Sequence, residues 1–366
     1  MSETAYQNFN SNPHQPRTKR MINVALASYG MSSHVFHAPL LSVHPQLRLH
    51  SVLERHRSDS IERYPEVKLV RKYEDLLADD TVEVIVVNTP NPYHYDMAEA
   101  ALRAGKHVVV EKPFTNTTKE GEKLIALAKE QDRVLTVFQN RRWDSDFLTV
   151  QKVLAADVLG TVVEYEAHYD RFRNYIQPDT WKEDDGPGSG ILYNLGSHMI
   201  DQALVLFGLP KTLFAKLSIQ RTGGKAPDAY HLILGYETMQ VVLKSSYLVR
   251  DQGPRYKVLG SQGTFTKHGL DPQEDLLKLG VSPDNSRIGQ EPEADWGTLD
   301  TTINGIQVRG TVASELGDYT RFYDNLYQVL QGEEALAVPA EEALNVIRLI
   351  ELAYQSDKSG QEVAVN

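Results

Sequence analysis

Short β-branched runs alternate with helix-forming segments along the chain between residues 22 and 143. One run, Val84–Val87, is apolar at every position, as expected of a central parallel strand that is covered on both faces. Strands that alternate with helices in this way predict a parallel, doubly wound α/β sheet. The expected strands are Ile22–Ala27, Leu47–Leu53, Val67–Val70, Val84–Val87, His107–Val110 and Val134–Phe138, and the expected helices include Tyr73–Leu77, Tyr95–Ala104 and Thr118–Gln131.

The pattern changes after Phe147, where strand-like runs recur with few helices between them. Val162–Tyr169 alternates polar and apolar residues, which is typical of a sheet with one face in water. We therefore expect an α+β domain with a large, mostly antiparallel open sheet. Residues 279–300, rich in Pro, Gly and Asp, predict a long loop. The other expected strands are Leu213–Gln220, Tyr230–Tyr236, Met239–Ser246 and Arg255–Leu259, and the expected helices are Ser197–Phe207, Asp318–Leu330 and Ala340–Gln355.

The length of 366 residues agrees with two domains, at a prior of about 150 residues per domain. The change of pattern places their join near residue 145. We expect residues 1–20 to form a disordered leader, because they are polar and lack the apolar segment of a signal peptide. Residues 21–144 then form the first domain and residues 145–364 the second.

The chain is acidic, with 38 Lys and Arg against 49 Asp and Glu and a formal net charge of -11. This balance argues against nucleic acid or an anionic membrane as the main partner. No apolar run approaches the roughly 20 residues of a membrane-spanning helix, so the sequence predicts a soluble, cytoplasmic protein. The chain contains no cysteine, which excludes disulfides, thiol nucleophiles and cysteine metal sites.

The segment that follows the first expected strand lies where a glycine-rich dinucleotide loop would lie. Two of the three glycines of that pattern are replaced, but Gly30 occupies the position where a missing side chain lets a pyrophosphate approach the backbone. The next helix would offer free N–H groups to the phosphates. An ordinary strand-to-helix turn is the alternative. The candidate cofactor contacts in this loop are Ser28, Gly30, Met31, Ser32 and Ser33.

The end of the second expected strand carries opposite charges that bear on the choice between NAD and NADP. Glu54 lies 21 residues after Ser33, where an acidic side chain normally binds the ribose hydroxyls and disfavours a 2′-phosphate. Arg55 would instead pair with that phosphate, although a solvated surface charge is an equal alternative for it. The sequence therefore leaves NAD or NADP open.

Two further segments follow expected strands at the edge of the sheet where ligands bind in open α/β folds. One contains Thr89, Asn91 and His94, and the other begins with Glu111 and Lys112. We include all five among the candidate cofactor contacts.

Four motifs together resemble the Gfo/Idh/MocA oxidoreductases, and the resemblance covers nearly the whole chain from residue 21 to about residue 364. They are Ala104–Val108 running into Glu111–Pro113, the loop Thr89–His94, Asn140–Asp144, and Gly188–Asp201. Three stretches are closer still to the scyllo-inositol 2-dehydrogenase-like branch: Val35–Leu40, Arg141–Phe147 and Gly269–Glu274.

The resemblance implies an NAD(P)-binding Rossmann domain in residues 21–144. It implies a substrate-binding and oligomerisation domain in residues 145–364, and hence a homodimer or homotetramer. Family members transfer hydride between C4 of the nicotinamide and a hydroxyl-bearing carbon. Characterised members of the branch mostly prefer NADP.

The resemblance also implies a catalytic set, since the family's Lys, Asp and His match Lys112, Asn194 and His198. The lysine would stabilise alkoxide character on the reacting oxygen, and an imidazole suits proton transfer near neutral pH. Asn194 departs from the family, because an amide can position a hydroxyl but carries no charge. Nothing in the resemblance asks for a metal ion. The candidate substrate contacts are Asn140, Arg141, His168, Asp170, Asn194 and His198.

We therefore expect an NAD(P)-dependent oxidoreductase that acts on a small-molecule cyclic polyol or sugar, with scyllo-inositol and its ketone as the specific choice. Two alternatives stay open. One is a dinucleotide-binding sensor or regulator without turnover, which the loss of a charge at Asn194 favours. The other is an NAD-dependent glycosidase that uses transient oxidation.

Overall fold

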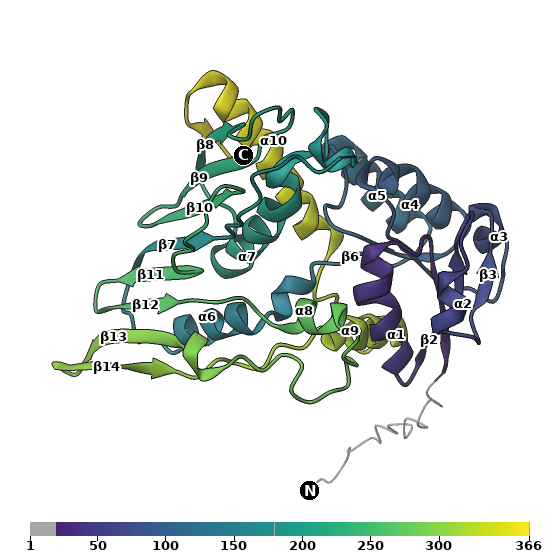
Figure 1. Cartoon of the computed structure of the whole chain (residues 1–366), viewed down its shortest axis with the longest axis horizontal. Helices are drawn as coiled ribbons and strands as arrows, with labels where there is room; N and C mark the ends of the chain where they lie inside the picture. Colours follow the sequence, from purple (N-terminus) through teal and green to yellow (C-terminus); the bar gives the residue numbers. More distant parts are fainter. Residues whose placement is uncertain (1–19, 179, 366) are drawn as a thin grey trace, which may run out of the picture.

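A computed structural model describes residues 20–178 and 180–365 of the chain (Figure 1). The predicted leader therefore lies almost entirely outside the described residues. The first half contains a six-stranded sheet in the order β3-β2-β1-β4-β5-β6, in which every neighbouring pair is parallel. This confirms the doubly wound sheet. Its strands are β1 (Ile22–Leu26), β2 (Leu47–Leu53), β3 (Lys68–Val70), β4 (Val84–Val87), β5 (His107–Val110) and β6 (Leu135–Val137).

The central position of β4 explains its composition, because all four of its side chains are buried. The strand order reverses between β1 and β4, and the loops that leave these two strands therefore diverge and open a crevice at their carboxyl ends. The connecting helices are η1 (Ser33–His37) continued by α1 (Ala38–Val43), α2 (Asp59–Arg63), α3 (Tyr73–Leu77), η2 (Asn91–Tyr93) continued by α4 (His94–Arg103), and α5 (Thr118–Glu130).

The second half contains a nine-stranded sheet in the order β14-β13-β12-β11-β7-β10-β9-β8-β15. Neighbouring strands are antiparallel except β7 and β10, which are parallel. The mostly antiparallel sheet is therefore confirmed. The strands are β7 (Val162–His168), β8 (Thr212–Ser218), β9 (Ala229–Gly235), β10 (Gln240–Ser246), β11 (Tyr256–Gly260), β12 (Gly263–Lys267), β13 (Gly297–Ile303), β14 (Ile306–Val312) and β15 (Val363–Ala364).

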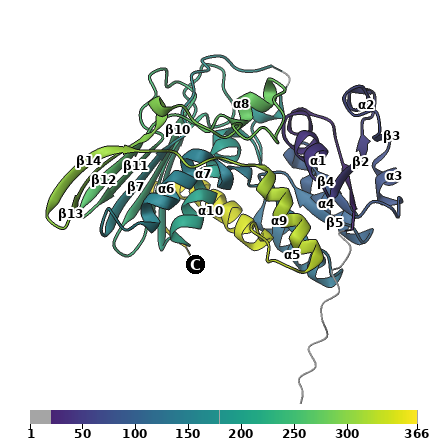
Figure 2. The ribbon, with the colours of Figure 1, turned by 90° about the horizontal axis from the view of Figure 1, so that it is seen from below.

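Helices cover one face of this sheet, as Figure 2 shows. They are α6 (Ser145–Ala155), α7 (Ser197–Phe207) and α10 (Ala340–Ser359). Tyr165 and Ala167 of β7 are buried beneath them, whereas Glu166 lies on the other face and pairs with Lys244 at 2.9 Å. The alternation along β7 therefore marks a sheet with one covered face.

The expected loop at residues 279–300 is wrong at its end, because η6 (Glu293–Asp295) and the start of β13 lie within it. Strand β13 contains three Thr and one Asp and has little apolar alternation. It forms by pairing with β12 on one side and β14 on the other. Such pairing partners do not show in a local hydrophobic pattern.

The two halves meet at η3 (Asn140–Trp143), which leads into α6. The expected domain boundary between residues 144 and 145 falls at this junction and stays a prediction. The later chain returns to the first half: α10 packs against α5, and the Glu351 carboxylate accepts hydrogen bonds from the Thr118 N–H (2.9 Å) and hydroxyl (2.6 Å). The remaining helices are η4 (Trp181–Glu183), η5 (Leu192–Gly196), α8 (Gln273–Lys278) and α9 (Thr320–Gln331). Across the described ranges, no helix combines the length and apolarity that crossing a membrane requires.

Candidate active site

A cavity of about 450 Å³ lies between the two halves of the molecule. The first half contributes the loops after β1, β4 and β5, and the second contributes η5, α7 and the loop after β7. The cavity brings together these residues that the sequence singled out: Ser28, Gly30, Met31, Ser32, Thr89, Asn91, Glu111, Lys112, Asn140, Arg141, Asn194 and His198.

The first side of the cavity is formed by the loops that follow β1 and β4, where the strand order reverses. The Ser28 hydroxyl donates to the Asn88 main-chain oxygen at 2.9 Å, and the Asn88 amide donates back to the Ser28 carbonyl at 3.3 Å. Ser33 is fully buried beneath this pair, since its hydroxyl donates to the Ser28 oxygen at 2.5 Å and accepts from the Asn88 amide. Ser33 therefore fixes the loop and does not line the cavity.

This side of the cavity fits a dinucleotide. A side chain at Gly30 would meet only the Ser28 hydroxyl, at 4.0 Å, so the loop leaves open space for a ligand. The first N–H groups of η1 lie at the same edge, where a helix start favours phosphate. Two buried polar atoms of lining residues, Thr89 Oγ1 and Asn88 Oδ1, have no hydrogen-bond partner within the described residues. Such orphaned atoms are expected where a ligand supplies the partner.

Glu54 uses its carboxylate elsewhere. Its two oxygens accept the main-chain N–H groups of Ser60 at 2.8 Å and Asp59 at 3.1 Å, which lie in the first turn of α2. The side chain is buried, whereas Arg55 beside it is exposed. Arg71 stabilises the same loop by donating a hydrogen bond to the Glu54 main-chain oxygen at 2.8 Å. Glu54 therefore stabilises the start of α2, and its predicted contact with the ribose stays a prediction.

Lys112 lies where the two sides of the cavity meet. Its Nζ donates to the main-chain oxygen of Asn194 at 2.8 Å and lies 3.4 Å from the Asn194 amide oxygen. The Asn194 amide nitrogen donates in turn to the Tyr247 hydroxyl at 3.3 Å. Desolvation is the largest cause that lowers the pKa of Lys112 to about 7, and the charges of Lys182 and Arg141 act in the same direction, against those of Glu111 and Glu274.

His198 lies in the first turn of α7 and is buried, with no partner for its Nδ1 among the described residues. Burial lowers its pKa well below the ordinary value, and the nearby charges of Lys112 and Arg141 add to this effect. The imidazole is therefore neutral at pH 7 and presents both a donor and an acceptor.

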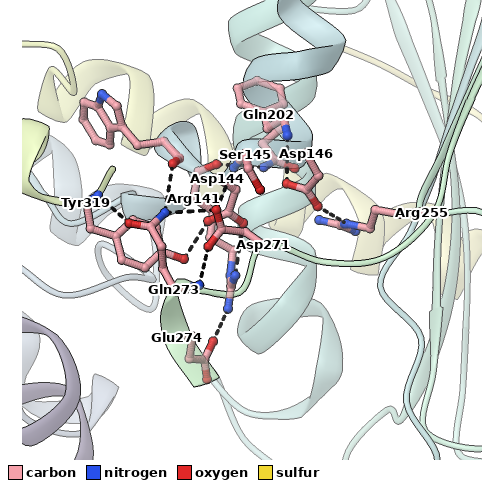
Figure 3. Close-up of polar contacts among 12 residues, drawn as sticks. Arg141, Asp144, Ser145, Asp146, Gln202, Arg255, Asp271, Gln273, Glu274 and Tyr319 are labelled. Atoms are coloured by element: carbon pink, nitrogen blue, oxygen red, sulfur yellow. Dashed lines mark hydrogen bonds and ion pairs between the residues drawn. The ribbon is translucent and has the colours of Figure 1, made fainter. Parts of the chain in front are cut away.

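Arg141 reaches the cavity from a network of buried acids (Figure 3). Its guanidinium donates to Asp144 at 3.1 Å and also to Glu274 of α8. Asp144 accepts a second hydrogen bond from the Tyr319 hydroxyl at 2.6 Å. Arg141 is 7% exposed, so these contacts fix the orientation of its guanidinium. Asn140, its neighbour in η3, lines the same cavity.

Besides Ser33, Glu54 and Arg55, three more predicted site residues lie outside the cavity lining, namely His94, His168 and Asp170. The ring of His94 is fully buried between the carbonyl oxygens of Thr89 and Pro113, each at 2.9 Å, and so joins the loops after β4 and β5. His168 lies on the uncovered face of the second sheet, where Glu166 (2.9 Å) and Asp170 (3.0 Å) hold its ring. Hydrogen bonds that the Asp170 and Glu166 carboxylates accept from its ring raise the pKa of His168.

The cavity also contains residues that the sequence did not single out as site residues. They include Arg171, Trp181 and Lys182 from the loop after β7, and Glu274 from α8. The available signal was the density of cations and aromatic residues after β7. The described residues hold no cluster of three or more His, Asp or Glu that could bind a metal. Asp201 instead pairs with Arg142 through two contacts of 2.7 and 2.9 Å.

Comparison with known protein families matches both halves of the chain to one oxidoreductase family. Residues 22–139 match its NAD-binding Rossmann fold (GFO_IDH_MocA), and residues 151–365 match its C-terminal alpha/beta domain (GFO_IDH_MocA_C).

Individual relatives extend over almost the full length. The uncharacterized oxidoreductase YdgJ of Escherichia coli is 42% identical, over 92% of this chain and 96% of YdgJ. The scyllo-inositol 2-dehydrogenase (NADP(+)) IolW of Bacillus subtilis is 38% identical, over 93% of this chain and 95% of IolW. The solved structure of yvaA from Bacillus subtilis superposes with a TM-score of 0.93 at 36% identity and covers 96% of this chain and all of yvaA.

Proposed function

This chain belongs to the Gfo/Idh/MocA oxidoreductase family, and from that premise we propose that it transfers hydride between C4 of a nicotinamide and a hydroxyl-bearing carbon of a cyclic polyol or sugar. We favour scyllo-inositol and its ketone as the substrate pair, because IolW, a relative at 38% identity, is a scyllo-inositol 2-dehydrogenase. The observation that carries the proposal is that Lys112 and His198 line one cavity with the dinucleotide loops of the β1–β4 switch.

Lys112 is proposed as the proton acceptor during oxidation of the polyol. A general base works best when its pKa lies near the working pH, and the pKa of Lys112 is lowered by desolvation to about 7. The bound dinucleotide supplies the hydride acceptor. As the hydride leaves the carbon, the hydroxyl proton moves to the Lys112 amine, and in the reverse direction the charged amine returns it.

His198 and Asn194 are proposed to hold the reacting hydroxyl. Burial lowers the pKa of His198 too far for it to be a strong base, but a neutral imidazole can orient a hydroxyl. Arg141 and Asn140 are the proposed substrate contacts on the η3 side. His168 would act from outside the cavity lining, so its proposed contribution is to position Asp170 and the start of the next loop.

NADP is the cofactor we propose as preferred. The Glu54 carboxylate accepts two hydrogen bonds from the first turn of α2, which orient it toward that helix. Arg55, exposed beside it, can pair with the 2′-phosphate of NADP. IolW is named for the same cofactor.

The test measures formation of reduced nicotinamide by the full chain with scyllo-inositol, using NADP+ and NAD+ in parallel. We expect turnover, with a higher kcat/KM for NADP+. Cofactor binding without turnover of any cyclitol or aldose would overturn the proposal and support a sensor. A cofactor that stays bound through purification and undergoes no net turnover would indicate the glycosidase alternative. Cytoplasmic location and assembly as a homodimer or homotetramer remain predictions.

A further inference from the structure

Two cations on the cavity wall have no acidic partner. Arg171 and Lys182 both line the cavity, and among the residues that the structure describes neither side chain makes a hydrogen bond or an ion pair. Each guanidinium or ammonium group only approaches an aromatic ring, at 5.3 Å for Arg171 over Tyr169 and 5.8 Å for Lys182 over Trp181. Both donors therefore remain available to a ligand.

The carboxylates that line the same cavity are already engaged. Glu111 accepts a hydrogen bond from the His37 ring at 2.9 Å. Glu274 pairs with Arg141 and also with Lys278 at 2.7 Å. Besides Lys112, three cations line the cavity (Arg141, Arg171 and Lys182) against two carboxylates, and only Arg141 among them is paired with a lining carboxylate. The cavity therefore has an excess of positive charge, although the whole chain is acidic.

The loop that carries Lys182 is anchored in the interior of the protein. Glu183, the next residue, forms a 2.6 Å ion pair with Arg221, and the two side chains are 9% and 1% exposed. Arg221 also pairs with Asp228 at 2.9 Å. Arg173 joins the same cluster through Glu183 at 3.3 Å. These buried ion pairs anchor the main chain beside Lys182, whereas the Lys182 side chain itself is exposed at the cavity.

The unpaired cations lie near the groups proposed for the chemistry. The charge of Lys182 is, after desolvation, the largest cause of the lowered pKa of Lys112. Arg171 is among the charges that lower the pKa of His198. An anion beside Arg171 and Lys182 would share the cavity with Lys112 and His198, and it would offset a repulsion that the protein otherwise carries.

We propose that Arg171 and Lys182 form an oxyanion subsite, which extends the substrates of this cavity beyond neutral scyllo-inositol to cyclic polyols or sugars that also carry a carboxylate or a phosphate ester. This inference rests on the proposed function, because it concerns the substrate of the same cavity. Arginine and lysine are the side chains suited to carboxylate and phosphate oxygens. Neutral polyols then bind the same cavity more weakly than their acidic counterparts.

The experiment measures the Kd of matched probes for the NADP+-saturated enzyme by calorimetry. Glucuronate is compared with glucose, and myo-inositol 1-phosphate with myo-inositol, so that the two arms distinguish a carboxylate from a phosphate. We expect at least one acidic probe to bind about tenfold or more tightly than its neutral partner. Arg171→Gln and Lys182→Gln should each remove most of that preference. Lys225→Gln, at a 70% exposed lysine outside the cavity, should leave it unchanged.

Three results would overturn the subsite. Acidic and neutral probes could bind equally well to the unmodified enzyme, or the preference could survive both substitutions. The third result is that the substitutions weaken the binding of NADP+ by the same factor as the binding of the acidic probe. The two cations would then be contacts of the dinucleotide. Failure of the proposed function looks different: the acidic probe still binds through Arg171 and Lys182, but no reduced nicotinamide forms with any polyol.

Discussion

The two sides of the cavity are built in different ways. The dinucleotide side consists of main-chain groups and small side chains in loops that directly follow β1, β4 and β5. The substrate side consists of long charged side chains, held by ion pairs between segments far apart in the chain, such as Arg141 with Glu274 across 133 residues. The first side depends on the strand order, whereas the second depends on side-chain partners that the strand order does not specify.

Lys112 gives the sharpest test of this division, since it follows β5 yet contacts Asn194 on the substrate side. Replacing Lys112 by Ala should lower kcat by about 10²- to 10⁴-fold, because it removes the proposed proton acceptor. The Kd of NADP+, measured by fluorescence titration, should change by less than about threefold. Lys112→Arg keeps the positive charge but not the low pKa, so it should lower kcat to a similar extent. If NADP+ binding fell together with kcat, the two sides would not be separable at this residue.

Arg221 tests whether buried ion pairs hold the substrate side. Arg221→Met leaves Glu183 and Asp228 without their common partner, and the loss of one partner of a buried pair costs about 3–5 kcal/mol. Urea denaturation should show this fall in the free energy of unfolding. The matched control is Arg309→Met, whose 3.8 Å pair with Asp300 is largely exposed and should contribute about 0–1 kcal/mol. Equal losses in the two variants would contradict the anchoring role of Arg221.

The same difference explains which parts of the site the sequence could predict. The loops beginning at Ser28, Thr89 and Glu111 each follow a short apolar strand, and a parallel sheet brings such strand ends to one edge. Lys182 follows no such rule. It reaches the cavity because the neighbouring Glu183 pairs with Arg221, which lies 38 residues further along the chain. No local periodicity encodes that contact.

Glu54 shows a different limit of sequence reasoning. Its place at the end of β2 was predicted, but the direction of its side chain depends on the free N–H groups of α2, which compete for the carboxylate. In the same way, the alternation along β7 predicted the strand but not which face the helices cover, and His168 lies on the uncovered one. A sequence pattern therefore predicts where a residue lies along an element more reliably than it predicts which groups its side chain contacts.

The choice of cofactor should depend on Arg55. Arg55→Ala removes the proposed partner of the 2′-phosphate, and we expect the ratio of kcat/KM for NADP+ over NAD+ to fall about tenfold. Glu54→Gln is the comparison: it weakens the acceptor for the first turn of α2, so it should cost about 1 kcal/mol of stability with little effect on that ratio. A larger change of the ratio in Glu54→Gln than in Arg55→Ala would mean that the carboxylate contacts the ribose after all.

At Asn194, the exchange of an amide for a carboxylate should be enough to shift the pH dependence of kcat/KM. In the unmodified enzyme, kcat/KM for polyol oxidation should rise with pH through about 7, as Lys112, whose pKa is lowered by desolvation, loses its proton. Asn194→Asp places a negative charge beside the amine, now 3.4 Å from the Asn194 amide oxygen. That charge favours the protonated form of Lys112 and raises its pKa, so the rise should move to higher pH while the rate at the plateau stays within a few-fold.

The control for this shift is Asn194→Ala, which removes the amide without adding a charge. Its profile should keep the rise near pH 7, even if the loss of the Tyr247 contact lowers the whole curve. If Asn194→Asp left the midpoint in place, Lys112 would not be the group that titrates. If Asn194→Ala moved the midpoint as far as Asn194→Asp does, the shift would come from packing. Only a shift specific to the aspartate would establish that the amide at position 194 keeps Lys112 a weak base.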